Sequence, residues 1–220
     1  MECTGLQQVL IPSSVEIICD CAFNGCSNLL EVIISEGVKE IGDDVFNCCY
    51  NLSSLVLPNS LIRFGCNVVS ATKVQLTNYM DGLYLGNEEN DHLILVERSS
   101  SSVSGEFVIH EDTRIIADSA LYYCSIENIV VPDSVISIGE NAFCNNLRLT
   151  SITIGLGVKY IGANAFVGCS ELTSITFKNL VGWRAIKDDE IVILDVSNAE
   201  TNVTYFKGTY HAHKWENVED

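Results

Sequence analysis

Basic residues are scarce in this chain of 220 residues, where 12 Lys and Arg stand against 29 Asp and Glu for a formal net charge of −17. Nucleic acids and anionic membrane surfaces both reward basic patches, so this balance argues against either as a partner. Long apolar runs are lacking too, and none approaches the roughly 20 residues that a membrane-spanning helix needs. We therefore expect no nucleic-acid partner and no direct membrane insertion.

The opening MECTGLQQVL lacks the basic start and the long apolar stretch of a secretory signal peptide. Cysteine, in contrast, is abundant, with ten residues. In a small secreted protein that number indicates disulfides, but in a chain of this length it also fits buried thiols in a reducing setting. The sequence leaves the compartment open.

Internal repetition is the strongest signal in the chain. The segments IPSSVEIICDCAFNGCSNLLEVI (11–33) and ISEGVKEIGDDVFNCCYNLSSLV (34–56) agree column by column at a spacing of 23 residues. The same frame returns in VPDSVISIGENAFCNNLRLTSIT (131–153) and IGLGVKYIGANAFVGCSELTSIT (154–176), after a degenerate copy at 109–130. A unit this short cannot bury its own apolar face, so the copies must stack into a solenoid.

Each unit predicts two short strands and a turn. The segment of the form L-x-x-I-x-I alternates as a strand does, and a second strand is expected over SVISIG and its equivalents. The NAF-x-G-C segment indicates a brief helical turn. One glycine recurs directly after the second strand, and we expect it to supply a backbone turn that other residues would make only with strain; the four copies are Gly42, Gly65, Gly139 and Gly162.

In these columns the sequence resembles the BspA-like, or Treponema pallidum type, leucine-rich repeat family. That pattern runs approximately L-x-x-I-x-I-P-x-S-V-x-x-I-G-x-x-A-F-x-x-C, and LTSITIGLGVKYIGANAFVGCSELTSITF follows it except for the proline. The resemblance covers residues 6–64 and 106–177. It implies a right-handed, curved, β-rich solenoid of 23-residue repeats with short helical turns. It also implies a binding role on bacterial or protist surfaces, without catalytic residues or cofactors.

Cysteines and phenylalanines each occupy a recurring column. The thiols are expected to form a buried, metal-free core ladder, made of Cys26, Cys49, Cys124 and Cys169. The rings are expected to form a second ladder, made of Phe23, Phe46, Phe143 and Phe166. Cys19 and Cys21 fall on a segment that favours small or polar residues, and no histidine is near them in sequence, so we interpret them as incidental and not as zinc ligands.

The repeats are interrupted in the middle of the chain and end before its last residues. GLYL, GNEEND and HLILVE predict an antiparallel hairpin that stands off the solenoid with an acidic turn at 87–91. The four histidines are scattered, and the HAH of residues 211–213 is interpreted as an exposed polar tail. After residue 177 we expect a cap with a helical turn at WRAI and strands at EIVILDV and NVTYFKGTYH. The residues expected to cover the last repeat are Trp183, Ile191, Ile193, Val203 and Tyr205.

Four segments follow from this pattern: repeats at 1–64, an irregular repeat and hairpin insert at 65–105, repeats at 106–177 and a cap at 178–220. The favoured function is a non-catalytic binding module that uses its concave sheet to recognise a protein, of a host or of the extracellular matrix, or a glycan. A structural spacer in a larger surface protein is a second hypothesis. A hydrolase or metal-dependent enzyme is a third, which would need a convergent polar pocket near the insert. The resemblance implies a surface or secreted location.

The candidate partner surface consists of the strand residues that alternate outward between the last two apolar positions of each unit. These residues are Leu10, Ile33, Val56, Val108, Val130, Thr153 and Thr176, flanked by Gln8, Glu31, Ser54, Asn128 and Ser151. Five of the seven are apolar, which the core does not require, so they indicate an exposed apolar stripe. The alternative is that β-branched residues simply favour strands.

Overall fold

The structure is a computed structural model that describes residues 5–99 and 107–218. Most of the run of four serines at 99–102 lies outside these residues, as does the expected boundary at 105/106. The chain divides into two compact units. Unit 1 comprises Met1–Thr77 and Leu85–Asp91, and unit 2 comprises Asn78–Tyr84 and His92–Asp220. The finer division into four segments stays a prediction.

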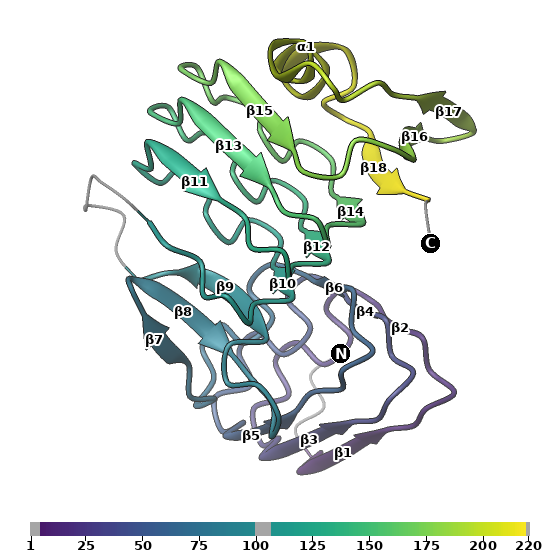
Figure 1. The fold of residues 1–220 in the computed structure, drawn as a ribbon. Helices are drawn as coiled ribbons and strands as arrows, with labels where there is room; N and C mark the ends of the chain where they lie inside the picture. Colours follow the sequence, from purple (N-terminus) through teal and green to yellow (C-terminus); the bar gives the residue numbers. More distant parts are fainter. Residues whose placement is uncertain (1–4, 100–106, 219–220) are drawn as a thin grey trace. The chain divides into compact units, whose positions relative to one another are not determined.

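Unit 1 is a stack of coils, each of which contributes one strand to each of two parallel sheets (Figure 1). One sheet contains β1 (Gln8–Ile11), β3 (Glu31–Ile34) and β5 (Ser54–Val56), and the other contains β2 (Ile17–Ile18), β4 (Glu40–Ile41) and β6 (Arg63–Phe64). Ile11 pairs with Ile34, and Ile18 pairs with Ile41. Both steps are 23 residues, which confirms the repeat register.

Unit 2 repeats this arrangement with β11 (Asn128–Val130), β13 (Ser151–Ile154) and β15 (Ser174–Phe177) in one parallel sheet. Its second sheet has nine strands in the order β17-β16-β18-β14-β12-β10-β9-β8-β7. The repeats supply β10 (Ile115–Ile116), β12 (Ser137–Ile138) and β14 (Tyr160–Ile161). The insert supplies β7 (Thr77–Tyr79), β8 (Gly82–Leu85) and β9 (Ile94–Arg98). The C-terminal segment supplies β16 (Trp183–Lys187), β17 (Glu190–Ile193) and β18 (Lys214–Asn217). Each unit is thus a β-solenoid.

The helical turns expected within the repeats are non-helical turns in the structure. Across residues 5–99 and 107–218, helix is confined to α1 (Ala199–Thr204) and the π-helix η1 (Tyr205–Thr209). In the turns, alternate residues donate to the coil stacked on them, as when the Phe23 N–H donates to the Val45 carbonyl at 3.0 Å, and the residues between them donate within their own turn, as when the Ala22 N–H donates to the Cys19 carbonyl at 3.2 Å. Bonding between coils takes the place of the i to i−4 bonds that a helix would need.

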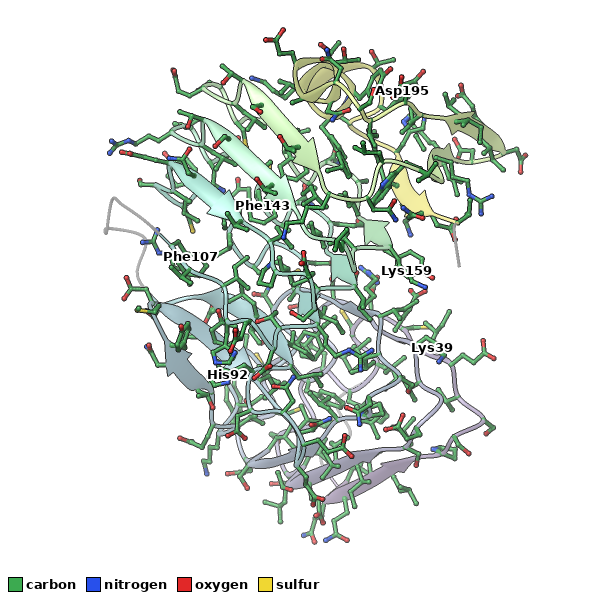
Figure 2. All side chains as sticks on the ribbon, viewed as in Figure 1. Lys39, His92, Phe107, Phe143, Lys159 and Asp195 are labelled. Atoms are coloured by element: carbon green, nitrogen blue, oxygen red, sulfur yellow. The ribbon has the colours of Figure 1, made fainter. Side chains whose placement is uncertain are left out.

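The phenylalanine ladder lies in the core of each unit. Phe46, Phe143 and Phe166 are fully buried, whereas Phe23 at the first coil is half-buried. The rings of Phe143 (labelled in Figure 2) and Phe166 stack with centroids 5.4 Å apart, and Phe23 stacks on Phe46 at 5.6 Å. The stacking distance follows from the spacing between adjacent coils.

The recurring glycine serves close packing and not a left-handed turn, which corrects the expectation from sequence. Left-handed backbone occurs at other glycines, such as Gly37 with φ 112°. A Cβ atom on Gly42 would lie 2.6 Å from the main-chain nitrogen of Asp20, and one on Gly139 would lie 2.5 Å from that of Asp118. The column therefore needs glycine because the preceding coil leaves no space for a side chain.

Part of the acidic excess links one coil to the next. The Asp43 N–H donates to Asp20 Oδ1 at 2.8 Å, and the Cys66 N–H donates to Asp43 Oδ1 at 2.9 Å. In unit 2 the Glu140 N–H donates to Asp118 Oδ1 at 2.8 Å. A carboxylate in this column accepts a main-chain N–H that the next coil would otherwise leave unpaired.

The insert differs from a detached two-stranded hairpin. Its strand β9 pairs in parallel with β10, where Ile94 lies opposite Ile115, so the insert continues the second sheet of unit 2. Its acidic turn is bonded to a coil of unit 1, because Asn87 Nδ2 donates to Asn59 Oδ1 at 2.8 Å and Asn59 Nδ2 donates to Glu89 Oε2 at 2.9 Å. The expectation that this segment stands off the solenoid is wrong.

The C-terminal segment also departs from the prediction. WRAI lies in β16 and is not a helical turn, and much of NVTYFKGTYH forms α1 and η1 and not a strand. Of the residues expected to cover the last repeat, Trp183 is buried against Phe177, with ring centroids 4.8 Å apart. Ile191 and Ile193 are exposed, and the remaining two are half-buried.

Two unpredicted aromatic residues close the core of the last coil. The Phe206 ring meets the edge of Phe166 at 5.0 Å and stacks on Trp215 at 3.6 Å. Trp215 belongs to β18, which pairs with β14 in antiparallel fashion. His213, expected in an exposed tail, is buried beside this strand. The cap itself was expected at 178–220, but the roles of Phe206, His213 and Trp215 in it were missed because these residues carry no repeat and periodicity could not assign them.

Candidate functional site

The outward face of β1, β3 and β5 carries three of the predicted surface residues in register. Leu10 lies opposite Ile33, and Ile33 lies opposite Val56. Their exposed fractions are 66%, 38% and 40%, whereas Val32, one position away on β3, is fully buried. Alternation along the strand therefore directs one apolar set into the core and leaves a second set in solvent.

Polar side chains border this stripe on unit 1. Gln8 Nε2 donates to Glu31 Oε2 at 3.2 Å, and these two residues lie opposite each other in the register. Ser54 occupies the next position and is half-buried. An apolar strip beside hydrogen-bonding groups can bury area against a partner and also orient it.

The equivalent face of unit 2 is less apolar. Val130 is 60% exposed and lies opposite Thr153, which in turn lies opposite the exposed Thr176. Val108 is exposed but belongs to no strand, contrary to its predicted position. Asn128 Oδ1 accepts a hydrogen bond from Ser151 Oγ at 2.7 Å, which holds the polar border in place.

An open depression of about 510 Å³ lies beside the polar border of unit 2. It is lined by Glu127, Leu147, Arg148, Thr150, Ser170 and Glu171. Arg148 forms an ion pair with Glu127, and both side chains are about half exposed. A depression of this kind offers mixed polar contacts to a ligand, but none of its lining residues belongs to the insert, where an enzyme site was expected to need a pocket.

Two of the histidines that are scattered in sequence come together in unit 2. The His92 and His110 rings stack with centroids 3.8 Å apart, and the Tyr79 ring meets the edge of His110 at 4.6 Å (His92 is labelled in Figure 2). The main-chain N–H of His110 donates to the Tyr84 hydroxyl at 3.1 Å. Burial raises the pKa of Tyr84 and keeps its phenol neutral. A sequence signal for this pair would have been the match between residues 94–95 of β9 and residues 115–116 of the following repeat, which pair in parallel in the structure.

The predicted thiol ladder lies in the cores of the two units. Cys26, Cys49, Cys124 and Cys169 are buried, and the cysteine side chains that the structure describes are thiols. Cys19 and Cys21 are exposed. Within residues 5–99 and 107–218, His, Cys, Asp and Glu form no cluster of three or more that could hold a metal ion. No helix in this part of the chain is long and apolar enough to cross a membrane.

The family model for the BspA type leucine-rich repeat region matches residues 1–84 and 100–204 with six copies. The chain therefore belongs to this leucine-rich repeat family. No curated protein matches it.

Solved structures of bacterial leucine-rich repeat proteins are similar at low identity. A protein from Eubacterium ventriosum is 17% identical with a TM-score of 0.45, and the match covers 80% of this chain and 61% of that one. The T. pallidum protein TpLRR is 22% identical with a TM-score of 0.35, and the match covers 79% of this chain and 71% of that one. The pneumococcal vaccine antigen PcpA is 20% identical with a TM-score of 0.41, and the match covers 80% of this chain and 52% of that one. This chain thus spans less than two thirds of the E. ventriosum and PcpA chains.

Proposed function

We propose that this chain is a non-catalytic binding module that recognises a protein through the outward face of β1, β3 and β5. The observation that carries the proposal is the aligned stripe of Leu10, Ile33 and Val56, which leaves apolar side chains in solvent where the core does not need them. Membership of the leucine-rich repeat family, whose solenoids offer extended surfaces for binding, supports it.

The identity of the residues separates this proposal from a simple strand preference. Valine, isoleucine and threonine favour strands whether or not they bind anything, which is enough to explain Val130, Thr153 and Thr176. Leucine is not β-branched, yet Leu10 is the most exposed of the three stripe residues in unit 1. We therefore place the main contact on unit 1, with the polar face of unit 2 as a secondary region.

A binding assay with matched variants tests this proposal. Immobilised extracellular-matrix proteins and a glycan array are probed with the wild-type chain, with the triple variant Leu10→Asp, Ile33→Asp and Val56→Asp, and with the control variant Thr153→Asp and Thr176→Asp. We expect binding to a protein that the triple variant loses by more than about tenfold and that the control retains. Unchanged binding by a folded triple variant would contradict the proposed face.

The remaining outcomes of the same assay distinguish the other functions. Binding to glycans alone would replace the protein partner, and binding to neither panel would favour a structural spacer. We further propose that the protein acts at the cell surface, in agreement with its family. Protease treatment of intact source cells should remove it, whereas survival of the full signal would oppose that location.

A further inference from the structure

Strand β17 (Glu190–Ile193) lies at one end of the nine-stranded sheet and pairs only with β16 in the strand order (Figure 1). Its two isoleucines were expected to cover the last repeat. Instead Ile191 is 56% exposed and Ile193 is 77% exposed, the highest value among the large apolar residues that the structure describes. The strand is therefore an apolar sheet edge within the described chain.

The register shows which main-chain groups face the open edge. Ala185 lies opposite Val192 and Arg184 lies opposite Ile193, and the Leu194 N–H donates to the Trp183 carbonyl at 2.9 Å. In an antiparallel pair, bonded and non-bonded residue pairs alternate. The main-chain groups of Val192 therefore bond to β16, and those of Ile191 and Ile193 point away from it.

The side chains of the same two residues face away from the core. Ile191 lies opposite Ile186, and residues opposite each other share a face of the sheet. The other face carries Ala185 and Trp215, which are fully buried. Ile191 and Ile193 thus present both polar main-chain groups and apolar side chains to any strand that approaches this edge, an arrangement that natural edge strands normally avoid.

The charges around β17 restrict what can pair with it. Asp188, Asp189 and Glu190 precede the isoleucines, with Lys187 of β16 opposite Glu190, and Asp195 follows them. Hydrogen bonds from the Ser197 side chain and N–H lower the pKa of Asp195, so this carboxylate is ionised near neutral pH. A second copy of the chain, paired antiparallel with Ile191 opposite Ile193, would place Asp189 opposite Asp195 at both ends. That repulsion disfavours self-pairing in the register that sets the two isoleucines against each other.

We propose that β17 is a docking edge for an extended segment of another protein, which adds as a strand with alternating apolar residues and with lysine or arginine at its ends. Main-chain hydrogen bonds to Ile191 and Ile193 would hold the segment, and the carboxylates at both ends of β17 would set its preference for basic flanks. This surface is separate from the three-stranded faces of the proposed function, so each can be tested alone.

The test uses two fluorescein-labelled peptides with the wild-type chain. One has the sequence Lys-Lys-Thr-Val-Thr-Val-Thr-Lys-Lys, and the other has glutamate at all four lysine positions. Fluorescence anisotropy should show binding of the basic peptide at least about tenfold tighter than of the acidic one, and the difference should shrink as salt is added. Equal affinities, or no binding of the basic peptide up to about 1 mM, would overturn the proposal.

Two variants locate the binding on β17. Ile193→Pro removes an N–H that points to the open edge, so it should weaken the basic peptide at least about tenfold while circular dichroism stays unchanged. Ile193→Lys adds a positive charge, like those of the basic peptide, and should weaken binding of that peptide as strongly without altering the backbone. The control Ile17→Lys, at an exposed isoleucine of unit 1 that lies outside the stripe of Leu10, Ile33 and Val56, should bind as the wild type does. Undiminished binding by a folded Ile193→Lys variant would overturn the proposal.

Sedimentation of the unlabelled chain tests the remaining occupant. We expect the wild type and Ile193→Lys to sediment identically, because self-pairing through β17 is disfavoured. A dimer that Ile193→Lys abolishes would instead identify a second copy as the occupant and overturn the proposal of a basic partner.

Discussion

The Cys169 thiol donates a hydrogen bond to the carbonyl oxygen of Phe143 in the preceding coil, with 3.1 Å between sulfur and oxygen. Cys49 makes the same contact with Phe23, also at 3.1 Å. The cysteine column is therefore more than small apolar filling, because its thiol adds a hydrogen bond between coils to a turn carbonyl that also accepts a main-chain N–H of its own turn, from Cys26 to Phe23 and from Asn146 to Phe143. Burial raises the pKa of both thiols to about 11.

This pKa predicts a loss of stability in alkali. Between pH 9 and pH 11 an unfolded thiol, with an ordinary pKa of 9.0, loses its proton while folded Cys169 keeps its own. Unfolding then releases a proton, so the free energy of unfolding falls as pH rises through this window and levels off near pH 11. Both tryptophans lie in unit 2, so urea unfolding followed by tryptophan fluorescence reports on this unit.

Cys169→Ala serves as the control for this pH dependence. The variant should be less stable at pH 8 because it loses a buried side chain, but its stability should fall less steeply from pH 9 to pH 11. Identical slopes for the wild type and the variant would contradict the assignment.

Asn146 occupies the cysteine column in the repeat at 131–153, and its role leads to a second prediction. It is fully buried, and its Nδ2 donates to Leu121 O at 2.6 Å and to Phe143 O at 2.8 Å. Asn146→Cys keeps a donor and should change stability by less than about 1 kcal/mol. Asn146→Leu removes the donor and should cost about 1 to 3 kcal/mol in the same fluorescence assay. Equal effects would show that the column selects for size alone.

The exposed and buried thiols should also differ in reactivity. At pH 8 iodoacetamide should alkylate Cys19 and Cys21 much faster than Cys49 and Cys169, because the thiolate is the nucleophile and burial withholds it from solvent. Peptide mass spectrometry over a time course measures the rates. Similar alkylation rates at all four cysteines in the folded protein would show that Cys49 and Cys169 are not buried in the core.

The coils and the columns could be predicted because a fixed spacing of 23 residues places equivalent side chains on one another. Ile33 and Phe166 followed directly from that spacing, and their strand register and ring stacking agree with it. Close approach between coils leaves no periodic signal of its own, so the glycine column was correctly found and wrongly explained.

Features without a repeat could not be predicted in this way. Phe206 and Trp215 belong to no repeat, and they stack beside the last coil because β18 turns back to pair with β14. The stacked histidines also depend on a pairing, that of β9 with β10, which the irregular insert concealed. The outward stripe was located by alternation along each strand, although its role in binding stays a prediction.

The phenylalanine ladder sets the scale for core substitutions. Phe166 is fully buried between Phe143 and Phe206, so Phe166→Ala should cost about 3 to 5 kcal/mol of unfolding free energy. The exposed Leu180 in the same unit is the control, and Leu180→Ala should cost less than about 0.5 kcal/mol. A loss below about 1 kcal/mol for Phe166→Ala would oppose the register of the coils.

The acidic turn of the insert should be ordered, in contrast to a detached hairpin. Asn87 Oδ1 accepts the N–H groups of Glu89 at 3.1 Å and Asn90 at 3.0 Å, and its Nδ2 bonds to Asn59. Hydrogen exchange at these two amides should therefore be slower than in an unstructured segment of the same sequence.

Asn87→Ala tests whether that one side chain organises the turn. The variant removes the acceptor of both amides and the link to Asn59, so their exchange should approach the unstructured rate while amides in β4 stay protected. Asn87→Asp keeps the acceptor but not the donor, so it should preserve the local bonds and lose only the attachment to the coil. If the two variants exchange alike, the side-chain acceptor does not hold the turn, and the order must come from the strands on either side of it.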